Sequence, residues 1–306
     1  MERKGADESM GTTASVSACE IACLPKDVLS EAISLTAPRD AFRAAAVSSA
    51  FRAAADSDAV WACFLPADLP PLSDGELSPV PLSKKALFMR LSERPVLLAG
   101  GLTSMWLNRE TGAKCYMLSA RALCITWGDT PQYWRWIPLT DSRFSEAAKL
   151  RAVCWLEIRG KIDSKMLSQN STYAAYIVFK IDDKHYGLDS PVQEATVSIG
   201  ENKSNRQVCL EGYDNKDDDE DEVPQNHRPM MSGMRRLLRR NRRVRPPAAC
   251  VQLPQERSDG WMELEMGEFY NEEGDDGEVS VSLMETRGGN WKKGLIVYGI
   301  EIRVKK

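Results

Sequence analysis

Three tryptophans, Trp127, Trp134 and Trp136, stand close together in the segment TWGDTPQYWRWIP, beside Asp129 and Gln132. Each tryptophan ring carries about 150–250 Å² of surface that water disfavours, so these rings must either fill a core or form a stacking surface. The polar neighbours favour a loop with exposed rings, on which a sugar ring could stack. Packing of the same rings in the protein core is the alternative.

Carboxylates that could accept hydrogen bonds from sugar hydroxyls occur at Glu278 and Glu285, which flank a predicted strand. Seven extended residues span about 23 Å, so both side chains could touch one small sugar only if the strand bends. Simple solvent exposure is the alternative for each. A glycosidase is not expected, because Glu263, Glu265 and Glu268 alternate along a strand instead of facing each other across a cleft.

Composition argues against an enzyme. The 306 residues are 43% hydrophobic and 27% charged, as in a soluble globular protein, and the net charge of −4 gives no bulk attraction to nucleic acid or membrane. Only two histidines are present, and the eight cysteines form no C-x-x-C pair. We therefore expect no metal site, no cofactor and no catalytic residue. The N-terminal residues lack the apolar run of a signal peptide, so we expect a protein of the nucleus and cytoplasm.

Residues 1–19 are small and polar and are predicted to be disordered. A small helical unit is expected over 20–66. Its first helix begins in LPKDVLSEAI, its second at Pro38, and its third near Ser48 or Ser49, followed by a last apolar cluster in DAVWACFLP. A unit of this size buries too little apolar surface to be stable alone, so we expect it to pack against a partner. The alternative is a helical extension that packs on the rest of the chain.

A proline-rich stretch over 67–83 is predicted to be an extended connector that sets the distance between two domains. A short helix is expected over 84–93, at the start of a second domain that covers 84–306. Several later segments alternate with the period of a β-strand, and their residues are apolar enough for a two-layer sandwich. These segments are 173–181, 262–266, 279–283 and 296–304.

A charged insertion at about 212–247 interrupts this second domain. Seven acidic residues fall within 214–222, and seven arginines fall within 235–245. Neither run can pack in a sandwich core, so both are predicted to lie in a disordered loop. The arginines could form a nuclear-localisation signal, whereas binding of nucleic acid is not favoured, and a solvated loop of opposite charges is the alternative. The candidate import residues are Arg235, Arg236, Arg239, Arg240, Arg242 and Arg243.

Four segments together resemble the phloem protein 2 lectins, also called Nictaba-like lectins. They are the tryptophan-rich segment with AVCWLEIRGKI, then YAAYIVFKI, RSDGWMELEMGEF and GNWKKGLIVYGIEIRVKK. The preceding order LPKDVLSEAISLTAPRDAFRAAAVSSAFRAAADSDAVW resembles an F-box. The whole chain is similar to plant F-box proteins of the phloem-protein-2-like B type. The resemblance implies an α+β multidomain chain, with an all-α F-box followed by an all-β, jelly-roll-like sandwich.

This resemblance also implies a function. The F-box would bind a Skp-type adaptor, and through it a cullin, in an SCF-type ubiquitin ligase, and the sandwich would hold the target. Adaptor contacts are expected at Leu24, Pro25, Val28 and Leu29. Carbohydrate contacts, to GlcNAc oligomers or the core of an N-glycan, are expected at Trp127, Trp134, Glu278 and Glu285. Two alternatives remain: a lectin that acts outside a ligase, and a receptor whose sandwich binds protein.

Overall fold

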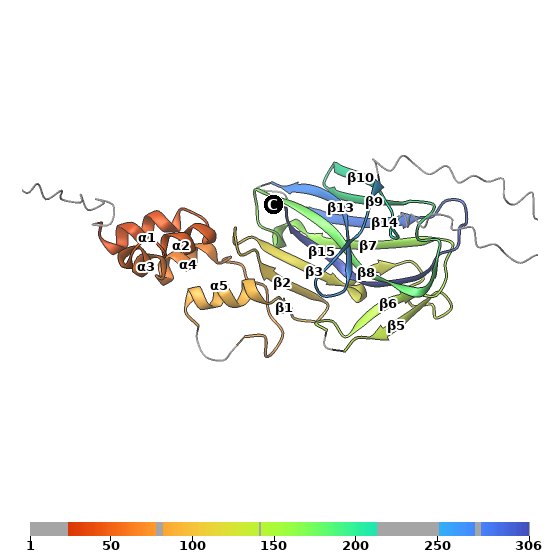
Figure 1. The fold of residues 1–306 in the computed structure, drawn as a ribbon, viewed down its shortest axis with the longest axis horizontal. Coiled ribbons are helices and arrows are strands. Elements are labelled where there is room, and N and C mark those ends of the chain that lie inside the picture. Colours follow the sequence, from red (N-terminus) through yellow and green to blue (C-terminus); the bar gives the residue numbers. More distant parts are fainter. Residues whose placement is uncertain (1–23, 78–81, 141, 213–250, 273–276, 306) are drawn as a thin grey trace, which may run out of the picture.

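The computed structural model describes residues 24–77, 82–140, 142–212, 251–272 and 277–305, and within them a group of helices precedes two β-sheets (Figure 1). No helix in these ranges is long and apolar enough to span a membrane. Residues 1–19, the import arginines and most of the charged insertion lie outside the described residues, so their expected disorder and role stay predictions. The helices are α1 Lys26–Ser34, α2 Pro38–Ala44, α3 Ser49–Ala55, α4 Asp58–Phe64 and α5 Lys84–Glu93.

The helix starts follow local chemistry. Proline occupies the first position of α2, where its missing N–H breaks no hydrogen bond. The Ser48 side chain caps α3 by accepting a hydrogen bond from the Phe51 amide at 3.3 Å. The segment predicted only as a last apolar cluster is in fact a fourth helix, α4. Its Trp61 is buried and donates its indole N–H to the Ala55 carbonyl at 2.7 Å, which ties α4 to α3.

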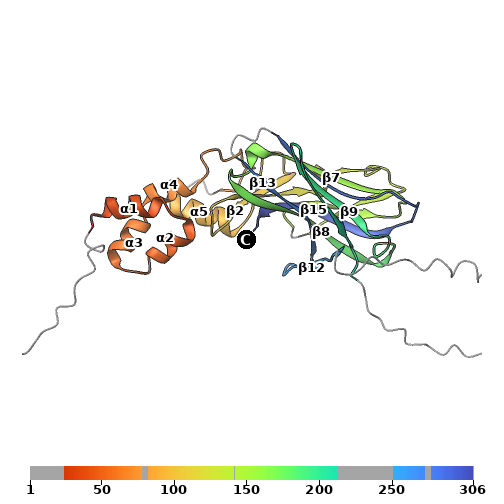
Figure 2. The same cartoon turned by 90° about the horizontal axis from the view of Figure 1, so that it is seen from above.

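Helix α5 completes the core of the helical unit. The Trp61 ring lies 5.0 Å from the ring of Phe88 on α5 and 5.0 Å from that of Phe42 on α2. The Asp58 carboxylate accepts a hydrogen bond from the Lys84 amide at 2.8 Å, at the first residue of α5. The small unit therefore finds its missing packing partner within the same chain. Helix α5 lies between α4 and the sandwich (Figure 2).

The connector packs against the sandwich. Within its described part, Leu72 forms a β-bridge with Leu98, and Asp68 accepts a 2.7 Å hydrogen bond from the nearly buried Lys114. The hairpin turn at Gly112 also touches the helical unit. A Cβ at this residue, whose φ is +77°, would lie 3.1 Å from the Phe64 carbonyl oxygen. Because the connector and this turn both make contacts, helices and sandwich form one packed body.

The strands form two sheets in the described part of the chain. The nine-stranded sheet has the order β1-β2-β3-β15-β8-β13-β12, with β6 pairing β15 and β5 pairing β6. The six-stranded sheet has the order β11-β10-β9-β14-β7-β4. The first sheet contains β1 Val96–Leu97, β2 Thr103–Leu107, β3 Lys114–Ser119, β5 Trp134–Pro138, β6 Glu146–Leu150, β8 Ser171–Tyr186, β12 Gln255–Glu256, β13 Met262–Asn271 and β15 Lys293–Val304. The second contains β4 Cys124–Ile125, β7 Leu156–Asp163, β9 Gln193–Ile199, β10 Asn202–Val208, β11 Val251–Gln252 and β14 Glu278–Glu285.

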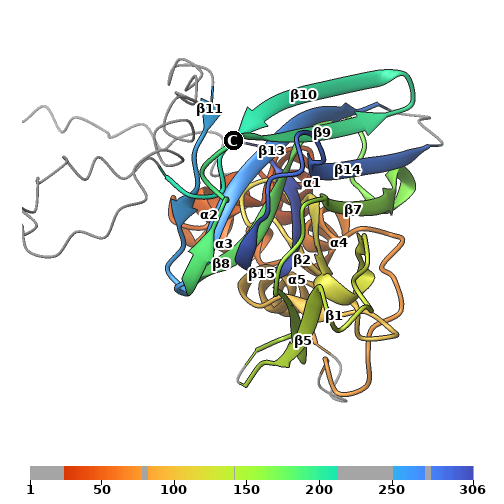
Figure 3. The ribbon, with the colours of Figure 1, turned by 90° about the vertical axis from the view of Figure 1, so that its right-hand side faces the viewer.

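The two sheets pack face to face, with β10, β9, β14 and β7 in one layer and β13, β8 and β15 in the other (Figure 3). Alternate residues of β7 and β8, such as Ile158 and Phe179, are buried between the layers. A Cβ at Gly160 would lie 3.1 Å from the Ile300 side chain, so glycine allows the layers to approach closely. The two-layer sandwich predicted from the period-2 alternation is confirmed.

Candidate functional site

The helical unit exposes several aliphatic side chains. Val28 on α1 is 49% exposed, Leu35 after α1 is 80% exposed, and Val47 before α3 is 69% exposed. Leu24 and Pro25 at the start of α1 are also exposed. Helices α1 and α3 lie at the end of the molecule far from the sandwich (Figures 1 and 2). This end therefore presents apolar surface that the described residues leave uncovered.

Leu29, expected in the adaptor surface, lies elsewhere. It is 2% exposed and packs in the core beside Ile33 and Ala54. Residues three or four apart share one face of a helix, so Leu29 and Ile33 face inward together, whereas Leu24 and Val28 lie outside that buried face. Leu29 holds α1 in place, and an adaptor would meet its exposed neighbours.

Trp127 is held outward by a tight turn. Its φ is 57°, a left-handed value that is uncommon for a bulky residue. The Gly128 amide donates to the Ile125 carbonyl at 2.9 Å, and the Thr130 amide donates to the Trp127 carbonyl at 2.9 Å. The ring is 44% exposed and packs against Tyr133, with 5.1 Å between centroids. One ring is thus supported from beneath and open to solvent, as a sugar-stacking platform requires.

Trp134 is not the exposed ring that the sequence suggested, although it lines a cavity beside the Trp127 turn. Trp134 and Trp136 belong to strand β5, which pairs with β6 in register Trp134–Leu150. Trp134 is 2% exposed and lies in the core, and Trp136 is partly covered by the Arg121 guanidinium, 3.6 Å from its ring centroid. The polar residues that suggested a loop occupy only the turn before β5.

Trp155 supplies the second exposed ring instead. Its indole N–H donates to the Glu157 carboxylate at 2.8 Å, and the Thr126 hydroxyl donates to the same oxygen at 3.2 Å. The Thr126 amide also donates to the Glu157 carbonyl at 3.0 Å, which joins the turn of Trp127 to strand β7. The alternation in the sequence around Leu156 places Trp155 and Glu157 on the outward face, and this signal could have identified both residues.

The carboxylate between these segments is held ionised. The hydrogen bond from Trp155 lowers the pKa of Glu157, and the charge and hydrogen bond of Arg159 act in the same direction against the effect of burial. An ionised carboxylate accepts hydrogen bonds strongly. The exposed rings of Trp127 and Trp155 therefore belong to two segments that Glu157 joins by hydrogen bonds at the β4–β7 edge of the six-stranded sheet.

Glu278 and Glu285 are not brought together. They stand at opposite ends of β14 and on opposite faces, since burial alternates along the strand. Glu278 is exposed and pairs with Lys161 at 2.7 Å. Glu285 is 5% exposed and forms an ion pair with Lys292, which is fully buried. Glu285 is therefore largely buried at its end of β14, where it also lines a cavity of about 720 Å³.

The Glu285–Lys292 pair supports the segment that precedes Trp155. Lys292 also donates hydrogen bonds to the carbonyls of Cys154 at 3.0 Å and Asn290 at 2.7 Å. Its backbone forms a β-bridge with Val153. The pair thus holds Cys154 in position, one residue before the exposed ring. The ion pair would therefore affect a ligand only indirectly, through the position of the backbone next to Trp155.

A cavity of about 1000 Å³ begins at the Gly128–Asp129 turn, and its lining includes Trp134, Trp136, Gln132, Arg151 and Lys184. These side chains offer both donors and acceptors in the cavity next to the Trp127 turn. In the described part of the chain no three His, Cys, Asp or Glu side chains are grouped as a metal ion would need. The site can therefore stack and hydrogen-bond a neutral polar ligand.

Comparison with known proteins identifies the family. Residues 113–304 match the family described as Phloem protein 2. The chain is 43% identical over 289 residues to the F-box protein PP2-B10 of Arabidopsis thaliana, covering 92% of this chain and 93% of that protein. It is 40% identical over 303 residues to the F-box protein PP2-B1 of the same plant, covering 92% and 89%. The chain therefore belongs to the phloem protein 2 family and is an F-box protein of the PP2-B type.

Proposed function

We propose that this protein is the substrate-recognition subunit of an SCF-type ubiquitin ligase. Its helical unit would dock a Skp-type adaptor, which links it to a cullin, and the chain itself would perform no catalysis. The exposed aliphatic surface of Leu24, Val28, Leu35 and Val47 supports this proposal, because apolar surface at one end of a small unit suits a protein partner. The family name of the relatives points in the same direction.

Association with the adaptor is the test of this proposal. The purified full-length chain, mixed with a Skp-type adaptor, should elute from gel filtration as a complex of one copy of each. Failure of the two proteins to associate would contradict the ligase role and favour a lectin that acts alone.

We propose further that the sandwich, with the jelly-roll-like connectivity of its family, captures targets through carbohydrate at the rings of Trp127 and Trp155. A sugar ring would stack on the exposed indoles, and its hydroxyls would donate to Glu157. The expected ligands are GlcNAc oligomers and the core of an N-glycan. Of the residues predicted from the sequence, Trp127 would contact the sugar. Trp134 and Glu285 are largely buried and would support the site from within, and Glu278 lies at the other end of β14.

Replacing Trp127 or Trp155 by alanine should weaken binding of chitotriose by about five- to thirtyfold, because each variant removes a stacking ring worth about 1–2 kcal/mol. The fold should survive, since both side chains are exposed. Isothermal titration calorimetry with the full-length chain measures the change. The matched control is Tyr270→Ala, which removes an equally exposed ring from the other sheet. Binding that both tryptophan variants retain would move target recognition to protein contacts.

The affinity for sugar should be constant between about pH 5.5 and 8, and should fall only below the ordinary glutamate range. Because Trp155 and Arg159 lower the pKa of Glu157, the ionised form persists to more acidic pH than in an unfolded chain. Its contribution to stability is likewise present above the unfolded pKa and is lost as pH falls through the lower, folded pKa. Titration of chitotriose at each pH tests this. A Glu157→Gln variant should bind more weakly and lose the acidic decline, whereas a decline above pH 6 would contradict the assignment.

A further inference from the structure

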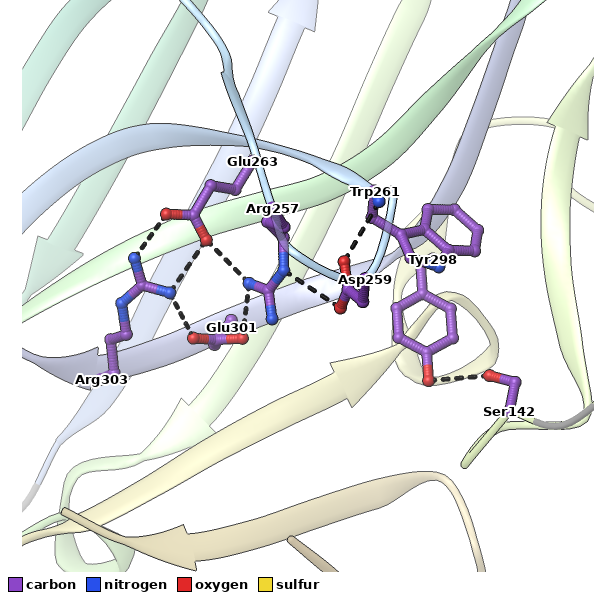
Figure 4. Close-up of polar contacts among 8 residues, drawn as sticks. All are labelled: Ser142, Arg257, Asp259, Trp261, Glu263, Tyr298, Glu301 and Arg303. Carbon is purple, nitrogen blue, oxygen red and sulfur yellow. Dashed lines mark hydrogen bonds and ion pairs between the residues drawn. The ribbon is translucent and has the colours of Figure 1, made fainter. Parts of the chain in front are cut away.

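A second group of aromatic side chains lies on the outer face of the nine-stranded sheet, the face turned away from the other layer. Trp261 stacks on Tyr298 with 4.7 Å between ring centroids, and Phe144 lies 5.4 Å from Tyr298. Phe144 and Tyr298 are nearly buried, although their sheet has its main core on the opposite face. The Ser142 hydroxyl donates to the Tyr298 hydroxyl at 3.0 Å (Figure 4).

A cavity of about 770 Å³ opens beside this cluster. Its walls include Trp106, Trp261 and Tyr298 from the sheet side, with Glu93 at the end of α5 closing one edge. Pockets for small molecules usually measure about 300–1,000 Å³ and combine aromatic walls with a few polar groups. Both the size and the lining of this cavity therefore suit a small ligand.

Most charged groups around the cavity already neutralise one another. Arg257 contacts Asp259 at 3.4 Å, Glu263 at 2.7 Å and Glu301 at 3.0 Å (Figure 4). Arg303 joins the same two glutamates, at 2.6 Å and 2.5 Å. Burial would raise the pKa of Glu263, but the hydrogen bonds and charges of Arg303 and Arg257 lower it overall. This network is complete without a ligand.

Two cations in the cavity differ from the network. Arg143 donates to the buried Ser104 hydroxyl at 3.0 Å, and Lys180 lies 4.7 Å from the ring centroid of Trp261. Neither forms an ion pair with a carboxylate among the described residues, although Glu93, Asp259 and Glu301 line the same cavity. Burial lowers the pKa of Arg143, and Tyr298 and the charges of Glu301 and Glu76 oppose this effect only in part. A charged group in this condition is stabilised by an anion that approaches it.

We propose that this cavity binds a small organic carboxylate that carries a flat ring. The carboxylate would lie between Arg143 and Lys180, and the ring would lie against Trp106 and Trp261. The cation–π contact of Lys180 and the hydroxyl contact of Arg143 orient both cations without a direct ion pair to a carboxylate. The site is separate from the sugar surface, which lies at the edge of the other sheet, so it does not depend on the proposed carbohydrate function.

The test compares two probes by calorimetry with the full-length protein, 3-phenylpropionate and its neutral amide. The acid should bind, and the amide should bind at least about tenfold more weakly, because a charge-assisted contact to a carboxylate is worth about 1.5–3 kcal/mol. The tripeptide Ala-Ala-Phe, with a free or an amidated C-terminus, presents the same carboxylate and ring from a peptide. Binding of the free tripeptide alone would assign the site to a peptide terminus and would support the same chemistry.

Lys180→Gln and Arg143→Gln should each lower the affinity for 3-phenylpropionate by at least about tenfold. Lys161→Gln is the matched control, because it removes a lysine from an exposed strand position on the other sheet. Circular dichroism verifies that each variant is folded, and Lys180, at the cavity wall, provides the variant least able to disturb the core. Equal affinity for acid and amide, no binding of acid or free tripeptide, or full affinity in Lys180→Gln would each overturn the proposal.

Discussion

Replacing Glu285 by alanine is expected to lower the free energy of unfolding by about 3–5 kcal/mol, because the change leaves the buried charge of Lys292 without its partner. For a domain of this size the midpoint of thermal unfolding should fall by roughly 6–20 °C. Sugar binding should weaken as well, since Lys292 holds the carbonyl of Cys154 beside Trp155. Differential scanning calorimetry of the full-length chain measures the first effect directly.

A double variant separates structure from ligand contact. Glu285→Met combined with Lys292→Met removes both charges and fills the space with side chains of similar volume, so most of the lost stability should return. Glu278→Ala is the control, because Glu278 is an exposed glutamate of the same strand and should change stability by about 0.5 kcal/mol or less. If Glu285→Ala kept its thermal midpoint but lost sugar binding, Glu285 would be a ligand contact and its buried placement would be contradicted.

Val28→Asp should weaken the adaptor complex at least about a hundredfold. A charge placed in an apolar interface without a partner costs several kcal/mol, and each 1.4 kcal/mol corresponds to about tenfold in affinity. The helical unit itself should remain stable, because Val28 is exposed and lies in the first turn of α1, where a negative charge is favourable to the helix dipole. Surface plasmon resonance with an immobilised Skp-type adaptor measures the affinity.

The matched control for this substitution is Leu253→Asp, which places the same charge at an exposed leucine of the sandwich. Its affinity for the adaptor should equal that of the unchanged protein. Full adaptor affinity in Val28→Asp would place docking on another face of the helices, whereas equal loss in both variants would indicate a general effect of charge.

Local patterns predicted much of the fold. Serine and proline signals placed the helix starts, and the short helix predicted over 84–93 coincides with α5. Period-2 alternation identified β8, β13, β14 and β15, because a half-buried strand must present alternate residues to the core. Helix α4 was not predicted as a helix, because its seven residues are too few to distinguish a helical period from an irregular apolar cluster.

The site was predicted less well, because burial of a side chain depends on pairing between distant segments. Trp134 is followed by an exposed arginine and preceded by a polar turn, yet the pairing of β5 with β6 buries it. In the sequence Glu285 fits an exposed strand end, whereas in the structure it forms an ion pair with the buried Lys292. Trp155 and Glu157 were visible in the alternation, but only the hydrogen bonds to Thr126 show that they adjoin Trp127.

In the proposed function the helical unit and the sandwich act together, because the first recruits the ligase and the second holds the target. The most direct measurement is ubiquitin transfer in a reconstituted reaction that contains the full-length chain, a Skp-type adaptor, a cullin with its RING subunit, and a glycoprotein with an exposed N-glycan core. We expect ubiquitin chains on the glycoprotein, and we expect their loss with Val28→Asp, with Trp127→Ala, or after removal of the glycan. Equal ubiquitination of the glycan-free protein, or no transfer although the adaptor complex forms and the glycan binds, would contradict it.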